Sequence, residues 1–387
     1  MVHSHSEFDT CLEQALSLGE AGEFEAAVEE LNRAISLYSA DPAAFVHRGI
    51  LCGQMGQFDQ ALADFDRAVA LAPDDSWVWT NRAIAFGLMG AFDEAIASFD
   101  RAVELDGENT QALASRGETY REMGQFEAAI RDFDRVLDLD MDYFGAWMGR
   151  GHCFLQTGDL GDAFEDFDRA IDAGGGHPDA FVGRGEVHRL LGEFEGAISD
   201  FGEALSRMPE HLWARVSRGE TYREMGQFEA AIRDFDHVLD LDLDVIEGLA
   251  GRGSTYREMG RLEEALADFG RALSVTEEDA DVWAGRGDVY RQMGQLDRAV
   301  VDFGRALSLN PEHLWALVGR GVAYRGMNDL EASLDDFDRA VALDNRDIWV
   351  LAHRGETLRL LGRYDDALAD LNRAIELDRT HSWALER

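Results

Sequence analysis

The sequence predicts an all-α fold built from repeated helix hairpins, and three observations support this fold class. The pair Arg-Gly recurs every 34 residues, from Arg48-Gly49 to Arg354-Gly355, and Arg82-Ala83 fills the one gap. Within each period, apolar residues follow the spacing of two amphipathic helices. The 387 residues include only five prolines, which favours helices over a loop-rich β fold. A period of this length indicates a solenoid, in which each hairpin buries its apolar face against its neighbours.

The 34-residue period divides nearly the whole chain into eleven units without an insertion or a deletion. We number the positions of each unit as slots 1 to 34, so that Arg48 occupies slot 7. Residues 1–7 are expected to form an N-terminal leader, and residues 382–387 the start of a C-terminal helix. The predicted units are 8–41, 42–75, 76–109, 110–143, 144–177, 178–211, 212–245, 246–279, 280–313, 314–347 and 348–381.

The unit that begins at Thr110 shows how each hairpin is specified. Leu113, Gly117 and Tyr120 lie on one stripe of a first helix, and a second apolar stripe begins at Phe126. Slot 15, between the two helices, is glycine in ten units and asparagine in the eleventh, so it predicts a turn residue with positive φ. Small residues in slots 8 and 20 let the helix backbones approach closely, and the phenylalanine of slot 24 fills the space beside them.

This pattern resembles that of the tetratricopeptide repeat (TPR) family over nearly the whole chain. Slot 8 is glycine or alanine in every unit, and slot 20 is alanine in every unit except at Ser333. Slot 24 is phenylalanine from Phe65 to Phe337 and leucine in the two end units. The resemblance implies a right-handed α-solenoid superhelix whose first helices line a concave groove. It also implies a non-catalytic protein–protein interaction scaffold that binds a peptide or protein segment in that groove.

Composition excludes several other functions. All 36 basic residues are arginine, so lysine-dependent Schiff-base chemistry, a Walker A loop and a protein kinase site are excluded. The formal charge of −40 argues against nucleic acid and anionic membranes as partners. The sequence shows no secretory signal and no apolar run long enough to span a membrane, so we expect a cytoplasmic protein. The cysteines and histidines form no catalytic or ligand-binding motif, and we predict no catalytic residues, no metal and no cofactor.

Two columns of charged residues are candidates for function in the predicted groove. Slot 12 is arginine in seven units and slot 9 is acidic in five, while slot 2 carries several tryptophans. Guanidinium groups beside tryptophans could grip carboxylates and bulky side chains of an extended or helical peptide. The alternative is that slots 9 and 12, one helical turn apart, pair only with each other on a solvated face. The candidate partner-binding residues are Arg189, Arg223, Arg257, Arg291, Arg325, Arg359, Glu186, Glu220, Asp288, Glu356, Trp213, Trp315 and Trp349.

A third set of arginines, in slot 7, has a structural interpretation. Slot 23 is aspartate in nine of the eleven units. We expect the slot 7 arginines and the slot 23 aspartates to pair between packed helices and to specify their register.

The sequence leaves the partner open. The field of a chain with a charge of −40 favours a basic partner protein over an acidic one. The competing function is that of a regulatory or sensor subunit in a larger complex whose catalytic activity resides on another chain. End-to-end self-association is a further hypothesis, because the family usually ends in an extra solvating helix and residues 382–387 supply only its start.

Overall fold

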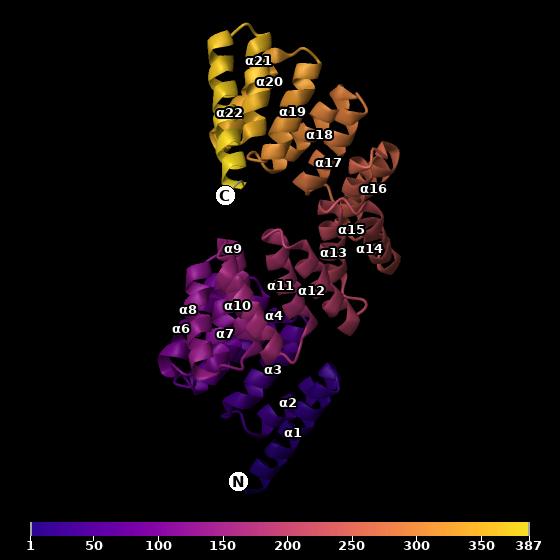
Figure 1. Ribbon diagram of the computed structural model, residues 1–387. Helices are drawn as coiled ribbons and strands as arrows, with labels where there is room; N and C mark the ends of the chain where they lie inside the picture. The colour runs from indigo at the N-terminus through magenta and orange to yellow at the C-terminus, as the bar shows by residue number, and fades with distance from the viewer. Residues whose placement is uncertain (1, 386–387) are drawn as a thin grey trace. The chain divides into compact units, whose positions relative to one another are not determined.

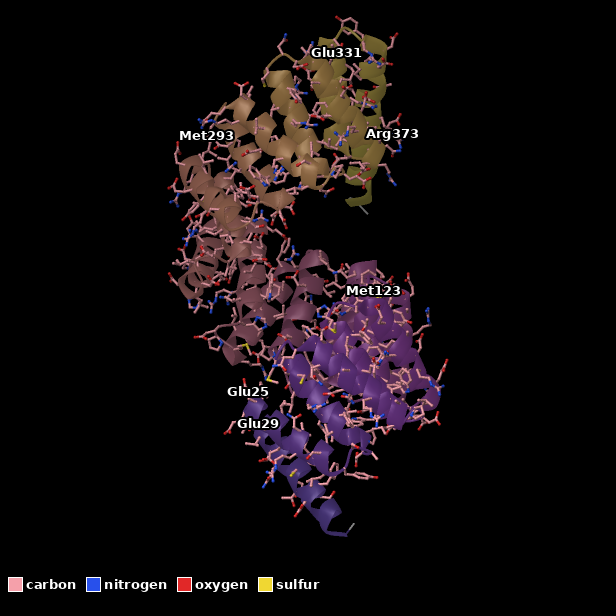
Figure 2. All side chains as sticks on the ribbon, turned by 180° about the vertical axis from the view of Figure 1, so that it is seen from behind. Glu25, Glu29, Met123, Met293, Glu331 and Arg373 are labelled. Atoms are coloured by element: carbon pink, nitrogen blue, oxygen red, sulfur yellow. The ribbon has the colours of Figure 1, made fainter. Side chains whose placement is uncertain are left out.

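The computed structural model describes the backbone of residues 2–385 and the side chains of residues 7–377. These residues form twenty-two α-helices and no strand, so the predicted all-α solenoid fold is confirmed. The chain divides into two compact units, Met1–Glu193 and Phe194–Arg387. Charged side chains project from the surface of the helices, among them Glu25 and Glu29 on α2 and Arg373 on α22 (Figure 2).

The first unit consists of five antiparallel hairpins followed by one more first helix (Figure 1). Each hairpin packs against the next, and consecutive first helices also contact each other. The helices are α1 (Val2–Glu20), α2 (Phe24–Leu37), α3 (Pro42–Gln54), α4 (Phe58–Leu71), α5 (Ser76–Leu88), α6 (Phe92–Leu105), α7 (Thr110–Glu122), α8 (Phe126–Leu139), α9 (Phe144–Thr157), α10 (Leu160–Ala173) and α11 (Pro178–Leu190).

The second unit begins with a second helix and continues with five hairpins of the same kind (Figure 1). Here too, each hairpin packs on the next through its second helix. The helices are α12 (Phe194–Arg207), α13 (Leu212–Glu224), α14 (Phe228–Leu241), α15 (Ile246–Glu258), α16 (Leu262–Val275), α17 (Ala280–Gln292), α18 (Leu296–Leu309), α19 (Leu314–Gly326), α20 (Leu330–Leu343), α21 (Ile348–Leu360) and α22 (Tyr364–Leu385).

The helices follow the 34-residue period closely, with differences at the two ends. From Pro42 to Ile348, every first helix begins at slot 1, and every second helix begins at slot 17. The expected N-terminal leader is helical from Val2 and belongs to α1. Residues 382–385, expected to belong to a C-terminal helix, continue α22 without a break to Leu385. No proline or glycine stands between residues 363 and 387 to end this helix.

The turn between the two helices has the predicted conformation. The slot 15 glycines have positive φ, for example 71° at Gly124, and Asn328 has a φ of 64°. Asparagine tolerates this left-handed region better than other residues with a side chain, which explains the single substitution in the column.

The phenylalanines of slot 24 form the core, and glycines on two different helices make room for them. Phe303 of α18 is fully buried. A Cβ atom on Gly287, in slot 8 of the same repeat, would lie 3.1 Å from its ring. A Cβ atom on Gly319, in slot 6 of the next repeat, would overlap the ring. The slot 8 contact was predicted, whereas the contact of slot 6 with the ring of the preceding repeat was not. Slot 6 is therefore glycine in several units because the preceding repeat inserts an aromatic ring there.

The slot 7 arginines join both the helices of a hairpin and consecutive repeats. Arg252 of α15 donates two hydrogen bonds, of 2.7 and 2.8 Å, to the carboxylate of Asp268 in slot 23 of the same repeat. It donates a third, of 2.6 Å, to Asp236 in slot 25 of the preceding repeat. Hydrogen bonding to Asp268 raises the pKa of the Arg252 guanidinium. The predicted pairing with slot 23 is confirmed for Arg48, Arg116, Arg150, Arg218, Arg252, Arg286, Arg320 and Arg354.

Candidate partner-binding site

A cavity of about 600 Å³ lies on the first-helix face of the second unit, between α17, α19 and α21. Trp315 and Trp349 line it, both from slot 2 of their repeats, together with Arg291 of α17. The indoles are 37% and 72% exposed, so they are large apolar surfaces that the fold itself does not cover. Asp288 of α17 also lines the cavity, so the structure brings four of the sequence-predicted candidate residues together around it.

The helical period explains why these residues share a face. Slots 2, 5, 9 and 12 are three or four residues apart, so they lie on one stripe of each first helix. In α19 this stripe supplies Trp315, Val318 and Val322 to the cavity, and α17 supplies Asp288 and Arg291. Valines and indoles therefore form the wall of the cavity, while the charged pair stands at one side.

The charges beside the cavity are arranged in a compact network. Arg291 donates to Asp288 at 2.7 Å, and Gln292 donates to the other oxygen of the same carboxylate at 2.9 Å. Arg257 of α15 lies 3.7 Å from Asp288, which is beyond hydrogen-bond distance, and its guanidinium carbon is 4.9 Å from the ring centroid of Trp315. Its buried Nη1 has no hydrogen-bond partner among the described residues. Burial lowers the pKa of Arg257, because a desolvated charge is disfavoured.

Arg325 and His353 form a second polar group at the cavity. Arg325 donates to the backbone oxygen and to Nδ1 of His353, both at 3.0 Å. Burial lowers the pKa of His353, and the positive charges of Arg325 and Arg291 lower it further. The imidazole is therefore neutral at pH 7, accepts at Nδ1 and carries its proton on Nε2. The centroid of its ring lies 5.4 Å from that of Trp349, so the imidazole stands beside one of the two indoles of the cavity.

Five of the seven slot 12 arginines pair with the slot 9 acid of their own helix. These pairs are Arg121–Glu118, Arg189–Glu186, Arg223–Glu220, Arg291–Asp288 and Arg359–Glu356. The interpretation that these columns pair with each other is thus correct at these positions. Arg257 and Arg325 differ, because Ser254 and Val322 occupy slot 9 in their helices. A role of either set in binding a partner stays a prediction.

The other candidate residues lie outside this cavity. Glu186 and Arg189 are on α11 of the first unit. Trp213, Glu220 and Arg223 are on α13, where Trp213 is 58% exposed. Glu356 and Arg359 are on α21, and they do not line the cavity.

Asp347 and His353 line the cavity but were not among the predicted residues. Asp347 caps α21 by accepting from the backbone N–H of Trp349 and Val350, so it fixes the helix end that presents Trp349. Its position just before a helix was a recognisable capping signal. His353 stands in slot 6, where several other units have glycine, and this substitution was the available signal for it.

Models of the tetratricopeptide repeat family match well over half of the chain. Those described as tetratricopeptide repeat match residues 42–75, 76–109, 115–178, 165–210, 214–245, 280–313 and 349–381, and one described as TPR repeat matches 253–290. The chain belongs to the tetratricopeptide repeat family. Three of the matched ranges, 42–75, 76–109 and 280–313, coincide with predicted units.

Solved structures share the fold of this TPR protein. The crystal structure of yeast Tom70 is 15% identical, with a TM-score of 0.53, and the match covers 99% of this chain and 94% of that one. A chain in the crystal structure of the APC/C hetero-tetramer Cut9–Hcn1 is 11% identical, with a TM-score of 0.56, and the match covers 96% and 93%. At these identities the likeness concerns the fold alone. No curated protein sequence matches this chain.

The described part of this TPR protein also bears on metal binding, on membrane-spanning helices and on the state of the cysteines. Among the described residues, no group of three His, Cys, Asp or Glu side chains could hold a metal ion. No helix in the described part of the chain combines the length and the apolar character needed to cross a membrane. Cys11, Cys52 and Cys153 are buried free thiols, and burial raises the pKa of each.

The C-terminal edge of the second unit exposes apolar side chains. Tyr364, Leu368 and Ile375 lie along α22 and are each more than half exposed. In interior repeats, the first helix of the following repeat packs against the second helix, which is the position that α22 has in its repeat. Glu13 occupies slot 6 of the first repeat, where several other repeats have a glycine against the ring of the preceding repeat. End-to-end self-association stays a prediction.

His152 of α9 gives the first unit a predicted dependence on pH. Burial lowers the pKa of its imidazole to about 4, and the positive charge of Arg121 acts in the same direction. The unfolded chain takes up this proton below about pH 6.5, while the folded protein resists it until about pH 4. We therefore expect the titration of His152 to lower the free energy of unfolding by roughly 2–3 kcal/mol as the pH falls from about 6.5 to about 4.

Urea titrations at pH 7.5 and pH 4.5 would measure this loss for the wild type and for His152→Phe, which keeps a ring beside Phe167. The wild type should lose more stability than the variant between the two pH values. Equal losses in both proteins would contradict the assignment, because the remaining carboxylates and histidines are common to both.

Proposed function

We propose that this TPR protein is a non-catalytic scaffold that binds a segment of a partner protein in the cavity between α17, α19 and α21. The observation that carries the proposal is the cavity of about 600 Å³ with two exposed tryptophans on its wall. Membership of a family of protein-interaction repeats supports the general class. Tryptophan and arginine are also the residues most often responsible for binding energy in protein interfaces.

The cavity favours a bulky apolar side chain of the partner. Such a side chain would lie between Trp315 and Trp349 and against Val318, and it would displace water from apolar walls. The Nε2–H group of neutral His353 would then donate to a backbone carbonyl or side-chain oxygen of the bound segment. Arg291 would contribute little new charge, because Asp288 already holds its guanidinium.

The charge of the whole chain bears on the partner and on the rate of binding. A net charge of −40 accelerates the approach of a basic protein and slows that of an acidic one. We therefore propose a partner that is basic overall and presents an apolar anchor. Added salt should slow its association more than it weakens the apolar contact.

The double substitution Trp315→Ala/Trp349→Ala tests this function. Affinity capture with the wild-type chain at low and high salt would provide partners, and titration calorimetry would then measure the affinity of each purified partner. We expect the double variant to weaken binding at least about tenfold, since two central aromatic anchors are lost. Trp213→Ala removes a slot 2 indole outside the cavity, whose exposed fraction of 58% lies between those of Trp315 and Trp349, and it should leave the affinity unchanged.

The outcomes separate the proposed function from its alternatives. An unchanged affinity in the double variant, with native circular dichroism, would remove the cavity from the interface. A single co-purifying enzyme would favour the regulatory subunit, whereas a range of basic clients would favour the scaffold. Turnover of a substrate by the purified chain would overturn the non-catalytic assignment.

A further inference from the structure

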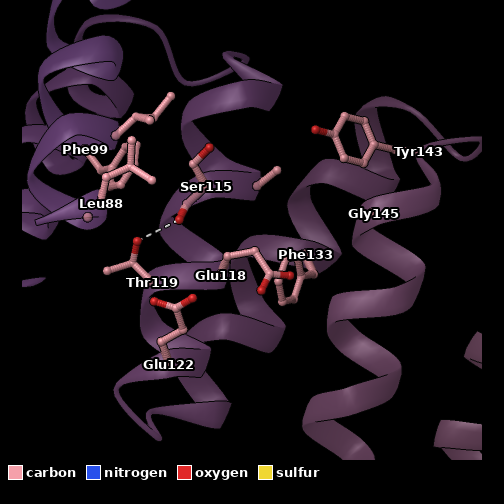
Figure 3. A pocket seen from close by; sticks show the side chains of 12 residues that line it. Leu88, Phe99, Ser115, Glu118, Thr119, Glu122, Phe133, Tyr143 and Gly145 are labelled. Atoms are coloured by element: carbon pink, nitrogen blue, oxygen red, sulfur yellow. Dashed lines mark hydrogen bonds between the residues drawn. The ribbon is translucent and has the colours of Figure 1, made fainter. Parts of the chain in front are cut away.

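A second cavity, of about 310 Å³, lies in the first unit between α5, α7 and α9 (Figure 3). Ile84 and Leu88 of α5 form an apolar wall, and Leu88 is 68% exposed. Glu118 and Glu122 extend into it from one face of α7, and Tyr143 borders it on the side of α9 (Figure 3). The cavity therefore combines an apolar wall with two carboxylates.

The two carboxylates are not equivalent. One oxygen of Glu118 accepts from Nε of Arg121 at 2.8 Å, so its charge is already balanced within α7. Glu122 is exposed and has no hydrogen bond or ion pair with any residue that the structure describes. The cavity thus holds one uncompensated negative charge.

The second unit shows what a glutamate in this position binds. Glu258 stands in slot 13 of its repeat, as Glu122 does. It accepts at 2.6 Å from Nη1 of Arg223, which stands in slot 12 of the preceding repeat, 35 residues earlier. The same guanidinium donates from Nε and Nη2 to Glu220, so its planar fork spans carboxylates of two repeats.

The corresponding cation is missing beside Glu122. The residue 35 positions before Glu122 is Gly87, and Gly87 lines the cavity. A Cβ atom built on Gly87 would meet no atom within 4 Å, so a side chain could leave the helix at this position. The cavity is therefore the place of a slot 12 arginine that this repeat lacks.

We propose that this cavity binds an arginine side chain of a partner protein, whose guanidinium pairs with Glu122 while its methylene stem lies along Ile84 and Leu88. The charge of −40 favours such a cationic anchor. Arginine fits better than lysine because Arg223 shows a guanidinium in the equivalent place and because its stem covers apolar surface. The site lies in the first unit and does not depend on the function proposed for the second.

Titration of the full-length protein with the peptide Ac-Gly-Arg-Gly-NH₂ tests this site, with the methyl group of Ile84 as a local NMR reporter. The arginine peptide should give a saturable shift of this methyl group. The citrulline peptide, which has the same shape without the charge, should not. A third peptide carries lysine in place of arginine. Equal shifts with the citrulline peptide or the lysine peptide would overturn the assignment to a guanidinium group. Tighter binding of free L-arginine than of the arginine peptide would overturn the assignment to a protein partner.

Three substitutions connect the shift to the residues of the site. Glu122→Gln should weaken binding at least about fivefold, because it removes the uncompensated charge. Gly87→Arg should abolish binding, because it supplies the missing guanidinium from the chain itself. Glu127→Gln removes the same charge from an exposed position on α8 and should bind as the wild type does. Wild-type binding by either of the first two variants would refute the proposal.

Discussion

The substitution Phe303→Ala is expected to destabilise the second unit by about 3–5 kcal/mol, since deletion of a fully buried ring leaves a cavity as well as a loss of apolar burial. The ring lies between Gly287 of its own repeat and Gly319 of the next. Neither glycine has a side chain that could move into the space, so the site collapses poorly. Urea titrations of the wild type and the variant, monitored by circular dichroism, measure the loss in the free energy of unfolding.

Phe303→Leu is the matched control for this experiment. Leucine already occupies slot 24 in two repeats of this chain, at Leu31 and Leu371. We expect the leucine variant to lose clearly less than the alanine variant, because it fills more of the space left by the ring. A loss below about 1 kcal/mol for Phe303→Ala would contradict the packing described for slot 24.

The sequence predicted the fold in detail because the same physical constraint recurs in every repeat. The pattern shared by the eleven repeats can be recognised even where one repeat departs from it. The apolar stripes, the turn at Gly124 and the pairing of slots 7 and 23 were therefore all predictable. The repeat pattern covers residues 8–381 only, so it did not show that α1 includes the residues from Val2 onward or that α22 continues to Leu385.

Contacts between repeats were harder to predict than contacts within one. The third hydrogen bond of Arg252, to Asp236, joins residues 16 positions apart in different repeats, and its signal was the aspartate that often occupies slot 25. The cavity between α5, α7 and α9 lies where the arginine column of slot 12 is interrupted. Glu122 lacks an arginine partner because slot 12 of the preceding repeat is Gly87. A pattern that describes the typical repeat does not reveal such a single substitution.

The substitution Asp302→Ala is expected to cost about 2–3 kcal/mol, because it leaves the Arg286 guanidinium without a carboxylate. Asp302 is buried and accepts from Nε and Nη2 of Arg286 at 2.7 and 3.0 Å. Slot 25 of the preceding repeat is Gly270, so no second acid is available. The guanidinium carbon of Arg286 lies 4.7 Å from the ring centroid of Trp283 and 5.8 Å from that of Tyr290, and neither ring replaces the lost carboxylate.

Asp268→Ala is the matched control, since it truncates the same side chain in the preceding repeat. Arg252 would keep its 2.6 Å bond to Asp236, so we expect a loss of only about 1 kcal/mol in the same urea titration. Adding Gly270→Asp to Asp302→Ala should recover part of the loss by placing a carboxylate in slot 25 beside Arg286. Equal losses for the two alanine variants, without recovery by Gly270→Asp, would show that slot 25 contributes nothing to holding consecutive repeats together.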